Sequence, residues 1–271
     1  MLKKKHVISW SGGKDSTATI ILFHEHEDEL LSEGEDVIIL YCEVMFDAKN
    51  GISGTNPEIR RFIYSKKKIF ESWGYTVEII RADGKYKDFL DVFYHPLGKK
   101  AAPEKVGKKH GFPLPKGKCA IKRELKEMPI KEWKKQNKGE MLEYIGIAID
   151  ERERLESMHK EQNKASLLEK YGYSEDDARA ICVRYDMLSP QYELEGQKRD
   201  GCWFCPYAKL VEHRNIRELY PDAWDKYVAL EEEDLAYKKW NPYTNQTLKQ
   251  RNEILRLYKP LNIFDVYDFL A

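Results

Sequence analysis

The segment at residues 11–16 reads Ser-Gly-Gly-Lys-Asp-Ser, and these residue types can together bind a phosphate group. It lies between a strand-like run and a helix-like run, so backbone N–H groups of the turn and the positive end of the helix dipole converge on one spot. Lys14 adds a full positive charge, and Ser11 and Ser16 add hydroxyls. Asp15 can cap the helix or help to hold Mg²⁺. The segment predicts an anion-binding loop; an ordinary Gly-Gly turn is the alternative.

The two glycines of this segment, Gly12 and Gly13, can take positive φ and form the turn. Their spacing excludes the two best-known glycine-rich phosphate loops. A Walker loop needs four residues between its first glycine and its Gly-Lys pair, and a dinucleotide fold needs Gly-x-Gly-x-x-Gly. The chain has neither pattern here.

The five cysteines offer a second kind of chemistry. Cys202 and Cys205 form a C-x-x-C pair, and two thiolates at this spacing can bind one metal ion or one cluster. Cys119 and Cys182 lie upstream, and four thiolates suit a 4Fe–4S cluster or Zn²⁺ equally well. Cys182 also fits a helix core, because its neighbours are Ala-Ile and Val. Cys42 lies within an apolar run and is expected to be a core residue.

Three further residues follow expected strands. Arg152 and Arg154 come after a strand at residues 144–149, and arginine binds phosphate or sulfate through two parallel hydrogen bonds. Arg154 is the better catalytic candidate; its alternative is an exposed helix position paired with a glutamate such as Glu151. Asp47 follows the second strand and can reach a nucleotide or Mg²⁺, although a turn role is the simpler interpretation.

Alternating strands and helices must position these residues. Near-continuous apolar runs, such as residues 37–44, are typical of strands buried on both faces. Strands that alternate with helices predict a parallel sheet covered on both faces, whose ligands bind at the carboxyl edge. We expect strands at 5–10, 37–44, 75–80 and 144–149, and helices at 15–27, 56–73, 86–94, 151–170 and 175–185. Asn56 should cap one helix, with Pro57 in its first turn and Gly74 after its end.

The bulk composition allows one large α/β domain or a domain with a smaller appendage. The chain has 271 residues, 42% of them apolar and 34% charged. Its 46 basic residues balance its 46 acidic ones, so net charge indicates nothing about a partner. No apolar stretch is long enough for a signal peptide or a membrane span, and we expect a cytoplasmic protein whose cysteines serve metal or redox chemistry rather than disulfides.

Two regions interrupt the alternation. Residues 95–118 hold four prolines, four glycines and seven lysines without periodicity, which predicts an exposed basic loop. Such a loop beside a phosphate site can hold nucleic acid, although a lysine-rich loop is more often only solvated. After Asp150 the pattern becomes helical. We therefore predict an α/β domain at residues 1–150 and a smaller helical region at residues 151–271.

The loop resembles the PP-loop of the ATP pyrophosphatase family, whose Ser-Gly-Gly-x-Asp-Ser signature follows the first strand. All signature positions are present at residues 11–16. The resemblance implies the Rossmann-like fold of the adenine nucleotide alpha hydrolases, binding of ATP and Mg²⁺, attack on the α-phosphate and release of pyrophosphate. It also implies catalytic roles for Lys14, Asp15 and Arg154, and ATP contacts from a wider set: Ser9, Ser11, Gly12, Gly13, Lys14, Asp15, Ser16 and Asp47.

Two later segments resemble the phosphoadenosine phosphosulfate (PAPS) reductase branch of that family. They are Cys-Ala-Ile-Lys-Arg-Glu-Leu at residues 119–125 and Tyr-Ile-Gly-Ile-Ala-Ile-Asp-Glu-Arg-Glu-Arg at residues 144–154. The Gly-Cys-x-x-Cys-Pro at residues 201–206 resembles sulfurtransferases of DNA phosphorothioation, which carry a 4Fe–4S cluster on four cysteines in this order. That resemblance implies the ligands Cys119, Cys182, Cys202 and Cys205, a nucleic acid or nucleotide substrate, and a sulfur-donor protein as partner.

Two alternatives remain open. A sulfonucleotide reductase of the PAPS type has the same fold, but such enzymes use a cysteine near their C-terminus, and no cysteine follows Cys205 here. A nucleotide-binding or nucleic-acid-binding module stapled by Zn²⁺ would bind ATP without turning it over. The sequence does not predict an oligomeric state.

Overall fold

The computed structural model describes residues 4–112, 119–193, 201–240 and 246–257. The chain divides into two compact units, each made of two stretches of sequence. Unit 1 comprises Met1–Asp91 and Ala120–Cys202, and unit 2 comprises Val92–Cys119 and Trp203–Ala271.

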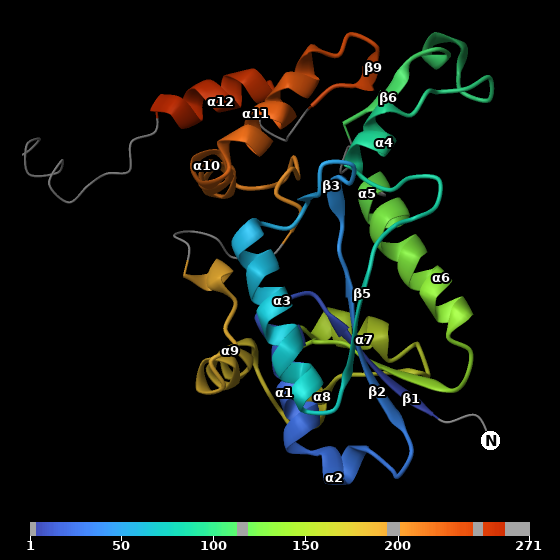
Figure 1. Cartoon of the computed structure of the whole chain (residues 1–271), viewed down its shortest axis with the longest axis vertical. Coiled ribbons are helices and arrows are strands. Elements are labelled where there is room, and N and C mark those ends of the chain that lie inside the picture. Colours follow the sequence, from blue (N-terminus) through green and yellow to red (C-terminus); the bar gives the residue numbers. More distant parts are fainter. Residues whose placement is uncertain (1–3, 113–118, 194–200, 241–245, 258–271) are drawn as a thin grey trace, which may run out of the picture. The chain divides into compact units, whose positions relative to one another are not determined.

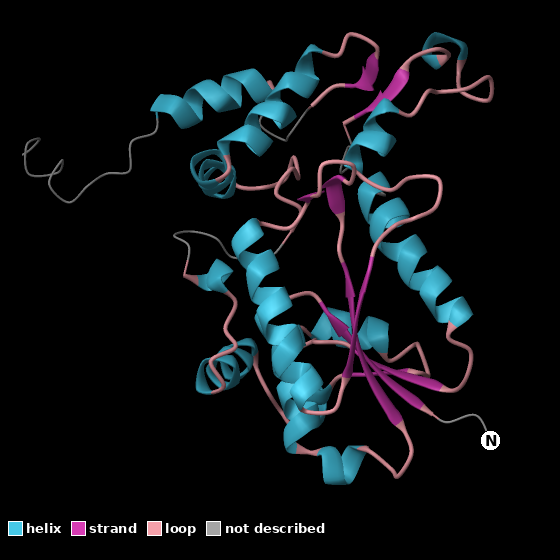
Figure 2. Cartoon of the chain, viewed as in Figure 1, coloured by secondary structure: helices cyan, strands magenta, loops and turns pink. Residues whose placement is uncertain are grey.

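Unit 1 is built on a five-stranded sheet, and all four of its strand pairings are parallel. Its strand order is β5-β2-β1-β7-β8, which confirms the predicted α/β fold with a parallel sheet (Figures 1 and 2). The strands are β1 (Lys5–Trp10), β2 (Asp36–Cys42), β5 (Thr76–Ile80), β7 (Met141–Tyr144) and β8 (Lys164–Ala165). β1 and β2 end together, since Trp10 pairs with Tyr41, so the loop after β1 begins at the carboxyl edge of the sheet.

Apolar side chains on both faces of the sheet are buried, as the continuous apolar runs predicted. On one face, Ile8 and Ile39 pack in a large core with side chains from α1 (Lys14–Glu25), α3 (Pro57–Ser72) and α9 (Glu175–Arg184). On the other face, Val7 and Ile38 pack against Trp133 of α6 (Met128–Gln136). Successive side chains of a strand point to opposite faces, so both faces of this sheet are apolar and helices pack on both.

Helix α3 forms where its capping residues predicted. The Asn56 side chain accepts a hydrogen bond from the Glu58 N–H at 2.9 Å, and Pro57 occupies the first turn. After Trp73 the chain reverses at Gly74, whose φ of 93° suits glycine. The helix buries Ile59, Phe62, Ile63 and Phe70, and each such side chain stabilises the fold by about 1.5–3 kcal/mol.

A helical segment at residues 120–136, which the sequence did not predict, carries the chain between β5 and β7. It consists of α5 (Ala120–Lys122), a π-helical turn (Arg123–Glu127) and α6. Pro129 has no N–H to offer the Leu125 carbonyl four residues earlier. The Cys42 thiol of β2 donates to that carbonyl instead, at 3.5 Å. Cys42 is buried in the sheet, as expected.

Two predicted elements are wrong in their bounds. The strand expected at 144–149 is β7 at Met141–Tyr144, and the next residues leave the ladder. The helix expected at 151–170 is broken into α7 (Arg152–Met158), β8 and α8 (Leu167–Lys170). The break occurs because Asn163 and Ala165 supply carbonyls to β7 and its extension, and Ser166 caps a new helix.

Unit 2 combines a short parallel pair of strands with three helices. β6 (Lys109–Gly111) pairs with β9 (Ala236–Lys238), and the helices are α10 (Leu210–Leu219), α11 (Pro221–Ala229) and α12 (Leu248–Leu257). Its aromatic residues form a core: Trp224 and Tyr227 are fully buried and Trp240 nearly so. Part of the region expected to be a loop at residues 95–118 is thus a strand, while residues 113–118 lie outside the described part.

The unit boundaries differ from the predicted division at residue 150. Residues 151–202 belong with the sheet, because β8 extends it and α9 packs along α1. The remaining elements are α2 (Glu27–Leu30), β3 (Met45–Asp47), β4 (Ile52–Ser53), α4 (Phe89–Tyr94) and the 3₁₀ turns Pro103–Lys105, Pro190–Tyr192 and Leu230–Glu232.

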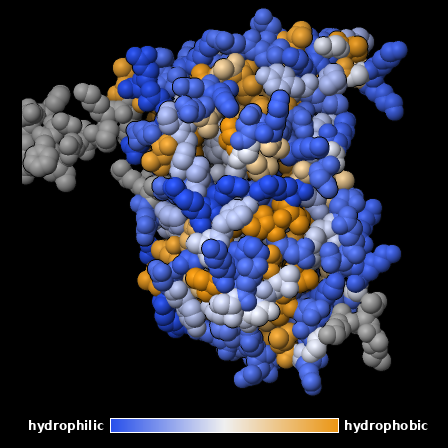
Figure 3. All heavy atoms as spheres, in the orientation of Figure 1, coloured by the Kyte–Doolittle hydropathy of each residue, from blue (hydrophilic) through white to orange (hydrophobic). Residues whose placement is uncertain are grey.

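Hydrophilic side chains cover most of the described face in Figure 3, in line with the 34% of charged residues in the chain. None of the helices formed by the described residues is both long and apolar enough to cross a bilayer.

Candidate functional site

The loop after β1 adopts a closed turn that its own hydroxyls stabilise. Gly12 has a φ of 86°, and Gly13 is extended and stands as the N-cap of α1. The Ser16 hydroxyl accepts from the Ser11 N–H at 3.1 Å and donates to the Gly13 carbonyl at 3.0 Å. The Ser11 and Ser16 hydroxyls are themselves 3.1 Å apart. The predicted strand–turn–helix is thus formed, with both serines inside it.

The N-terminus of α1 has no side-chain cap from its own N-cap residue. Its N-cap is a glycine, so no side chain caps the first turn. The helix has 12 residues, and its positive end carries about half an elementary charge. The Lys14 N–H, at the first helical position, donates to the Tyr192 hydroxyl at 3.0 Å. A neutral oxygen therefore contacts the helix end at a position that suits an anion.

A polar cradle lies beside Gly13. A Cβ atom added to this glycine would lie 3.4 Å from the Ser11 Oγ, 3.6 Å from the Tyr192 Oη and 3.9 Å from the Gln191 Nε2. These are ordinary contact distances, so a methyl group would fill the space without a clash. Glycine leaves this space free, and its polar lining suits a phosphate oxygen.

Gly146 lies against the backbone of the first turn of α1, next to the loop. A Cβ on this residue would lie 2.5 Å from the carbonyl carbon of Asp15 and 2.6 Å from the nitrogen of Ser16. Only glycine allows the chain after β7 to approach the first turn of α1 so closely. The sequence offered one signal for this contact, the glycine within Tyr-Ile-Gly-Ile, whose partner it could not identify.

The Lys14 side chain forms ion pairs with two carboxylates beside the loop. Its ammonium contacts Asp15 at 2.7 Å and Glu175 of α9 at 3.0 Å. Burial acts to lower the pKa of Lys14, but the bonds to Asp15 and Glu175 outweigh it and raise this pKa above its ordinary value. Burial raises the pKa of Asp15, an effect that Lys14 opposes and that Glu175 and Glu151 reinforce. The sequence did not predict that Glu175 contacts Lys14, because its local pattern indicates only the first turn of a helix.

Ser9 and Asp47 are not brought into the loop. The Ser9 hydroxyl donates to Glu143 at 2.9 Å, on the face of the sheet that α6 covers. Asp47 accepts hydrogen bonds from the backbone and side chain of Asn50, at 3.1 and 2.6 Å. This is the turn role that the sequence left as the simpler interpretation.

Arg154 is exposed on α7 and forms an ion pair with Glu151, three residues earlier. This arrangement is the alternative that the sequence allowed for it. Arg152 begins the same helix and is also exposed. Glu151 in turn accepts the Ala148 N–H at the start of this helix, and a catalytic role for Arg154 stays a prediction.

Cys182 lies in the core of unit 1. It is fully buried on α9, and its thiol donates to the Lys14 carbonyl at 3.3 Å. Burial raises the pKa of this thiol to about 12. A cluster or zinc ligand must be a thiolate, so these surroundings favour the helix-core alternative for Cys182.

The other three predicted ligands are only half-buried. Cys119 and Cys202 lie at two of the three points where the chain passes between units, and Cys205 belongs to unit 2. The C-x-x-C segment is anchored on its backbone: the Tyr227 hydroxyl donates to the Phe204 carbonyl at 2.6 Å, and the His213 Nε2 contacts the Cys205 carbonyl at 3.2 Å. Within the described residues, no three His, Cys, Asp or Glu side chains are grouped to hold a metal.

Several lysines of the basic region already have partners in unit 2. Lys105 and Lys108 lie over the ring of Tyr237, at 4.9 and 5.8 Å from its centroid. Lys109 contacts Glu233 at 2.7 Å. Lys99 and Lys100 are exposed. A nucleic acid partner for this region stays a prediction.

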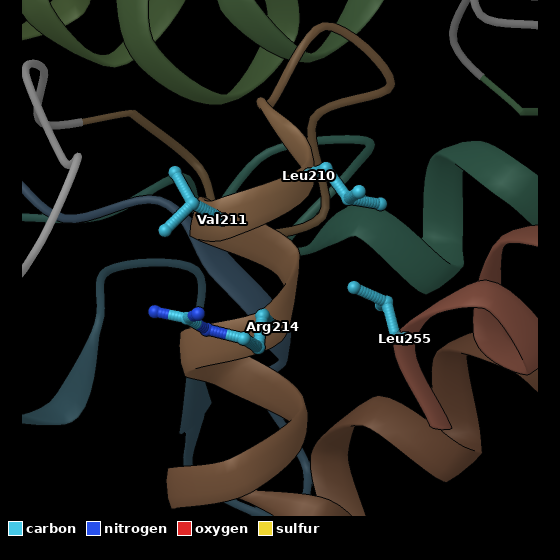
Figure 4. A pocket seen from close by; sticks show the side chains of 4 residues that line it. All are labelled: Leu210, Val211, Arg214 and Leu255. Atoms are coloured by element: carbon cyan, nitrogen blue, oxygen red, sulfur yellow. The ribbon is translucent and has the colours of Figure 1, made fainter. Parts of the chain in front are cut away.

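A small pocket in unit 2 is lined by residues that the sequence did not single out. Figure 4 shows Leu210, Val211 and Arg214 of α10 around it, with Leu255 of α12. Three apolar side chains and one arginine make no catalytic set.

Comparison with known proteins does not assign a function to this chain. No known protein family matches the sequence, and no curated protein sequence matches it. Among solved structures, the chain is similar to the U34-tRNA thiolase NcsA from Methanococcus maripaludis, determined with its 4Fe–4S cluster. The match covers 95% of this chain and 73% of NcsA, at 14% identity and a TM-score of 0.40. At these values the similarity supports no transfer of activity, ligands or residues to this chain.

Proposed function

We propose that this protein is an ATP pyrophosphatase of the PP-loop type, which binds ATP at residues 11–16, adenylylates a substrate and releases pyrophosphate. The observation that carries the proposal is the polar cradle beside Gly13, at the uncapped N-terminus of α1. It is lined by the Ser11 and Tyr192 hydroxyls and the Gln191 amide nitrogen, and the adjacent Lys14 carries a full positive charge. Each of these groups stabilises negative charge.

In the proposed reaction, an oxygen or sulfur atom of the substrate attacks the α-phosphorus of ATP. The new bond to phosphorus forms as the bond to the bridging oxygen breaks, and that oxygen leaves with pyrophosphate. Charge develops on the leaving group, where the α1 N-terminus and Lys14 stabilise it. Mg²⁺ would take phosphate oxygens and a carboxylate such as Asp15 as ligands. Arg154, which pairs with Glu151, has no assigned step in this scheme.

The first test measures pyrophosphate release from ATP by the full chain with candidate nucleophiles. Lys14→Ala should lower the rate at least a hundredfold, in line with the removal of a preorganised charged group. Lys170→Ala removes a lysine that pairs with a carboxylate, Glu29, at a similar distance of 2.7 Å, and should leave the rate unchanged. Equal rates for wild type and Lys14→Ala would contradict the loop assignment.

We further propose, from the sequence resemblance alone, a cysteine-ligated 4Fe–4S cluster with Cys119, Cys202 and Cys205 as candidate ligands, although the structure does not bring three such side chains together among the described residues. Cys182 is omitted from the set because its thiol is buried and bonded to the Lys14 carbonyl. A bound cluster would supply sulfur-handling chemistry, and the anchored backbone of Cys205 would orient one ligand. This fits a sulfurtransferase that acts on a nucleic acid or nucleotide, the class implied by the sequence resemblance.

The test is anaerobic purification followed by assays for iron and acid-labile sulfide. Iron should be lost in Cys202→Ser and retained in Cys182→Ser. Stoichiometric zinc without iron would support the Zn-stapled module instead, and iron loss in Cys182→Ser would restore that cysteine as a ligand. Nucleic acid that copurifies, identified by nuclease digestion, would define the substrate class.

A further inference from the structure

The 3₁₀ turn at Pro190–Tyr192 places two polar side chains against the loop at residues 11–16. Both belong to unit 1, although about 180 residues separate them from the loop. The Tyr192 hydroxyl accepts from the Lys14 N–H at 3.0 Å. The Gln191 amide nitrogen lies 3.9 Å from the Cβ position of Gly13. No part of the loop signature pointed to this turn.

The hydrogen bonds of Tyr192 leave its hydroxyl proton without an acceptor among the described residues. Its hydroxyl has two lone pairs and one proton. One lone pair accepts from the Lys14 N–H, and the Gln191 amide lies close to the same hydroxyl beside Gly13. No acceptor for the proton is found among the described residues. Burial raises the pKa of Tyr192, so the proton is retained at neutral pH. A polarised donor without an acceptor, beside an anion cradle, is ready to bind an anion.

Gln191 gives a second and independent indication of a ligand. Its side chain is 99% buried, and its Oε1 has no hydrogen-bond partner in the described structure. Ser189, two residues earlier, likewise has a buried hydroxyl without a hydrogen-bond partner there. A buried polar atom that lacks a partner costs about 1–3 kcal/mol; because the Gln191 Oε1 only accepts, a donor such as a water bound with the ligand, and not a phosphate oxygen, would recover this energy. The unsatisfied groups lie on the same turn that contacts Gly13 and Lys14.

We propose that Tyr192 is a phosphate-contacting residue of the ATP site, whose O–H donates to the pyrophosphate half of ATP, and that Gln191 is the positioning residue that holds it. This rests on the proposed function, because it needs ATP at residues 11–16. Tyr192 and Gln191 then line the phosphate site together with the Ser11 hydroxyl of the loop.

The test compares binding of ATP, pyrophosphate and AMP to the full chain by calorimetry. Tyr192→Phe should weaken ATP and pyrophosphate binding about tenfold, the usual effect of one hydrogen bond to a charged group, and leave AMP unchanged. Tyr185→Phe, which removes a hydroxyl that bonds to Glu25 at 2.8 Å, is the matched control and should change none of the three. Unchanged or tighter ATP binding by Tyr192→Phe would overturn the inference.

A second pair of variants keeps the test decisive if Tyr192→Phe folds poorly. Gln191→Met removes the amide, and Gln191→Glu replaces it with a carboxylate of the same shape. Repulsion should make ATP binding weaker in Gln191→Glu than in Gln191→Met, and equal affinities would overturn the inference. If wild type binds ATP and only these comparisons fail, the proposed function stands; if wild type binds no ATP or pyrophosphate, both fall.

Discussion

The backbone of Gly146 lies directly against the peptide of Asp15, so that a Cβ atom on Gly146 would be 2.5 Å from the Asp15 carbonyl carbon. This contact joins the end of β7 to the first turn of α1. The contact lies two residues after Tyr144, where the strand ends. The geometry of the phosphate loop therefore depends on a residue 130 positions away in the sequence.

Replacing Gly146 with alanine should destabilise unit 1 by about 1–3 kcal/mol, because the backbone of α1 must move to admit the methyl group. Urea denaturation followed by circular dichroism measures this change in the free energy of unfolding. Gly84→Ala is the control, since an added Cβ there would meet nothing within 4 Å, and its effect should be within about 0.5 kcal/mol of zero. Equal stabilities for the two variants would contradict the contact.

Removing the negative charge of Glu175 should strengthen ATP binding. The Glu175 carboxylate accepts from the Lys14 ammonium at 3.0 Å and competes with phosphate for it. Glu175→Gln should tighten ATP binding by about two- to fivefold, the scale of one partly exposed ion pair. Glu71→Gln, at a glutamate of similar exposure that pairs with Lys67, should have no effect on affinity. Weaker ATP binding in Glu175→Gln would instead make Glu175 a ligand-supporting residue.

Glu43 should make unit 1 sensitive to acid. Its carboxylate is fully buried and accepts from Arg60 at 2.6 Å and Arg81 at 2.8 Å. Burial alone would raise the pKa of Glu43, but the hydrogen bonds from both arginines outweigh it and hold this pKa below its ordinary value. The resulting stability is fully present above the unfolded-state pKa of about 4.3 and is lost as pH falls through the lower folded-state pKa.

Glu43→Gln tests this link between charge and stability. The variant should cost about 3 kcal/mol at pH 7, because it leaves two arginines beside a neutral buried amide. Its free energy of unfolding should also fall less steeply than that of wild type between about pH 5 and pH 3. Parallel pH profiles for the two proteins would show that Glu43 contributes no acid sensitivity.

The five thiols should fall into two classes of reactivity. Burial raises the pKa of Cys42 to about 11 and that of Cys182 to about 12, so at pH 8 only about one in a thousand or fewer of these thiols is ionised. Iodoacetamide should therefore label the half-buried Cys119, Cys202 and Cys205 first, in chelator-treated protein. Mass spectrometry over time separates the classes, and early labelling of Cys182 would contradict its core position.

The sequence by itself determined much of unit 1 because local patterns there are strong. Apolar runs predicted β1, β2 and β5, and the alternation with helices predicted the parallel sheet. Asn56, Pro57 and Gly74 marked both ends of α3 through their own backbone preferences. The loop at residues 11–16 was visible because its six residues are contiguous and its glycine turn is a local property.

The tertiary structure alone decided which distant groups meet that loop. Glu175, Gln191, Tyr192 and Gly146 reach it from three other segments, and no local pattern of residue types encodes such contacts. The helix at 120–136 escaped prediction because Pro129 lacks the N–H that its regular hydrogen-bond pattern needs, and the Cys42 thiol of β2, distant in sequence, donates to the Leu125 carbonyl. Cys182 was ambiguous in sequence for the same reason: a buried helix position and a metal ligand can have the same neighbours, and burial against Lys14 distinguishes them.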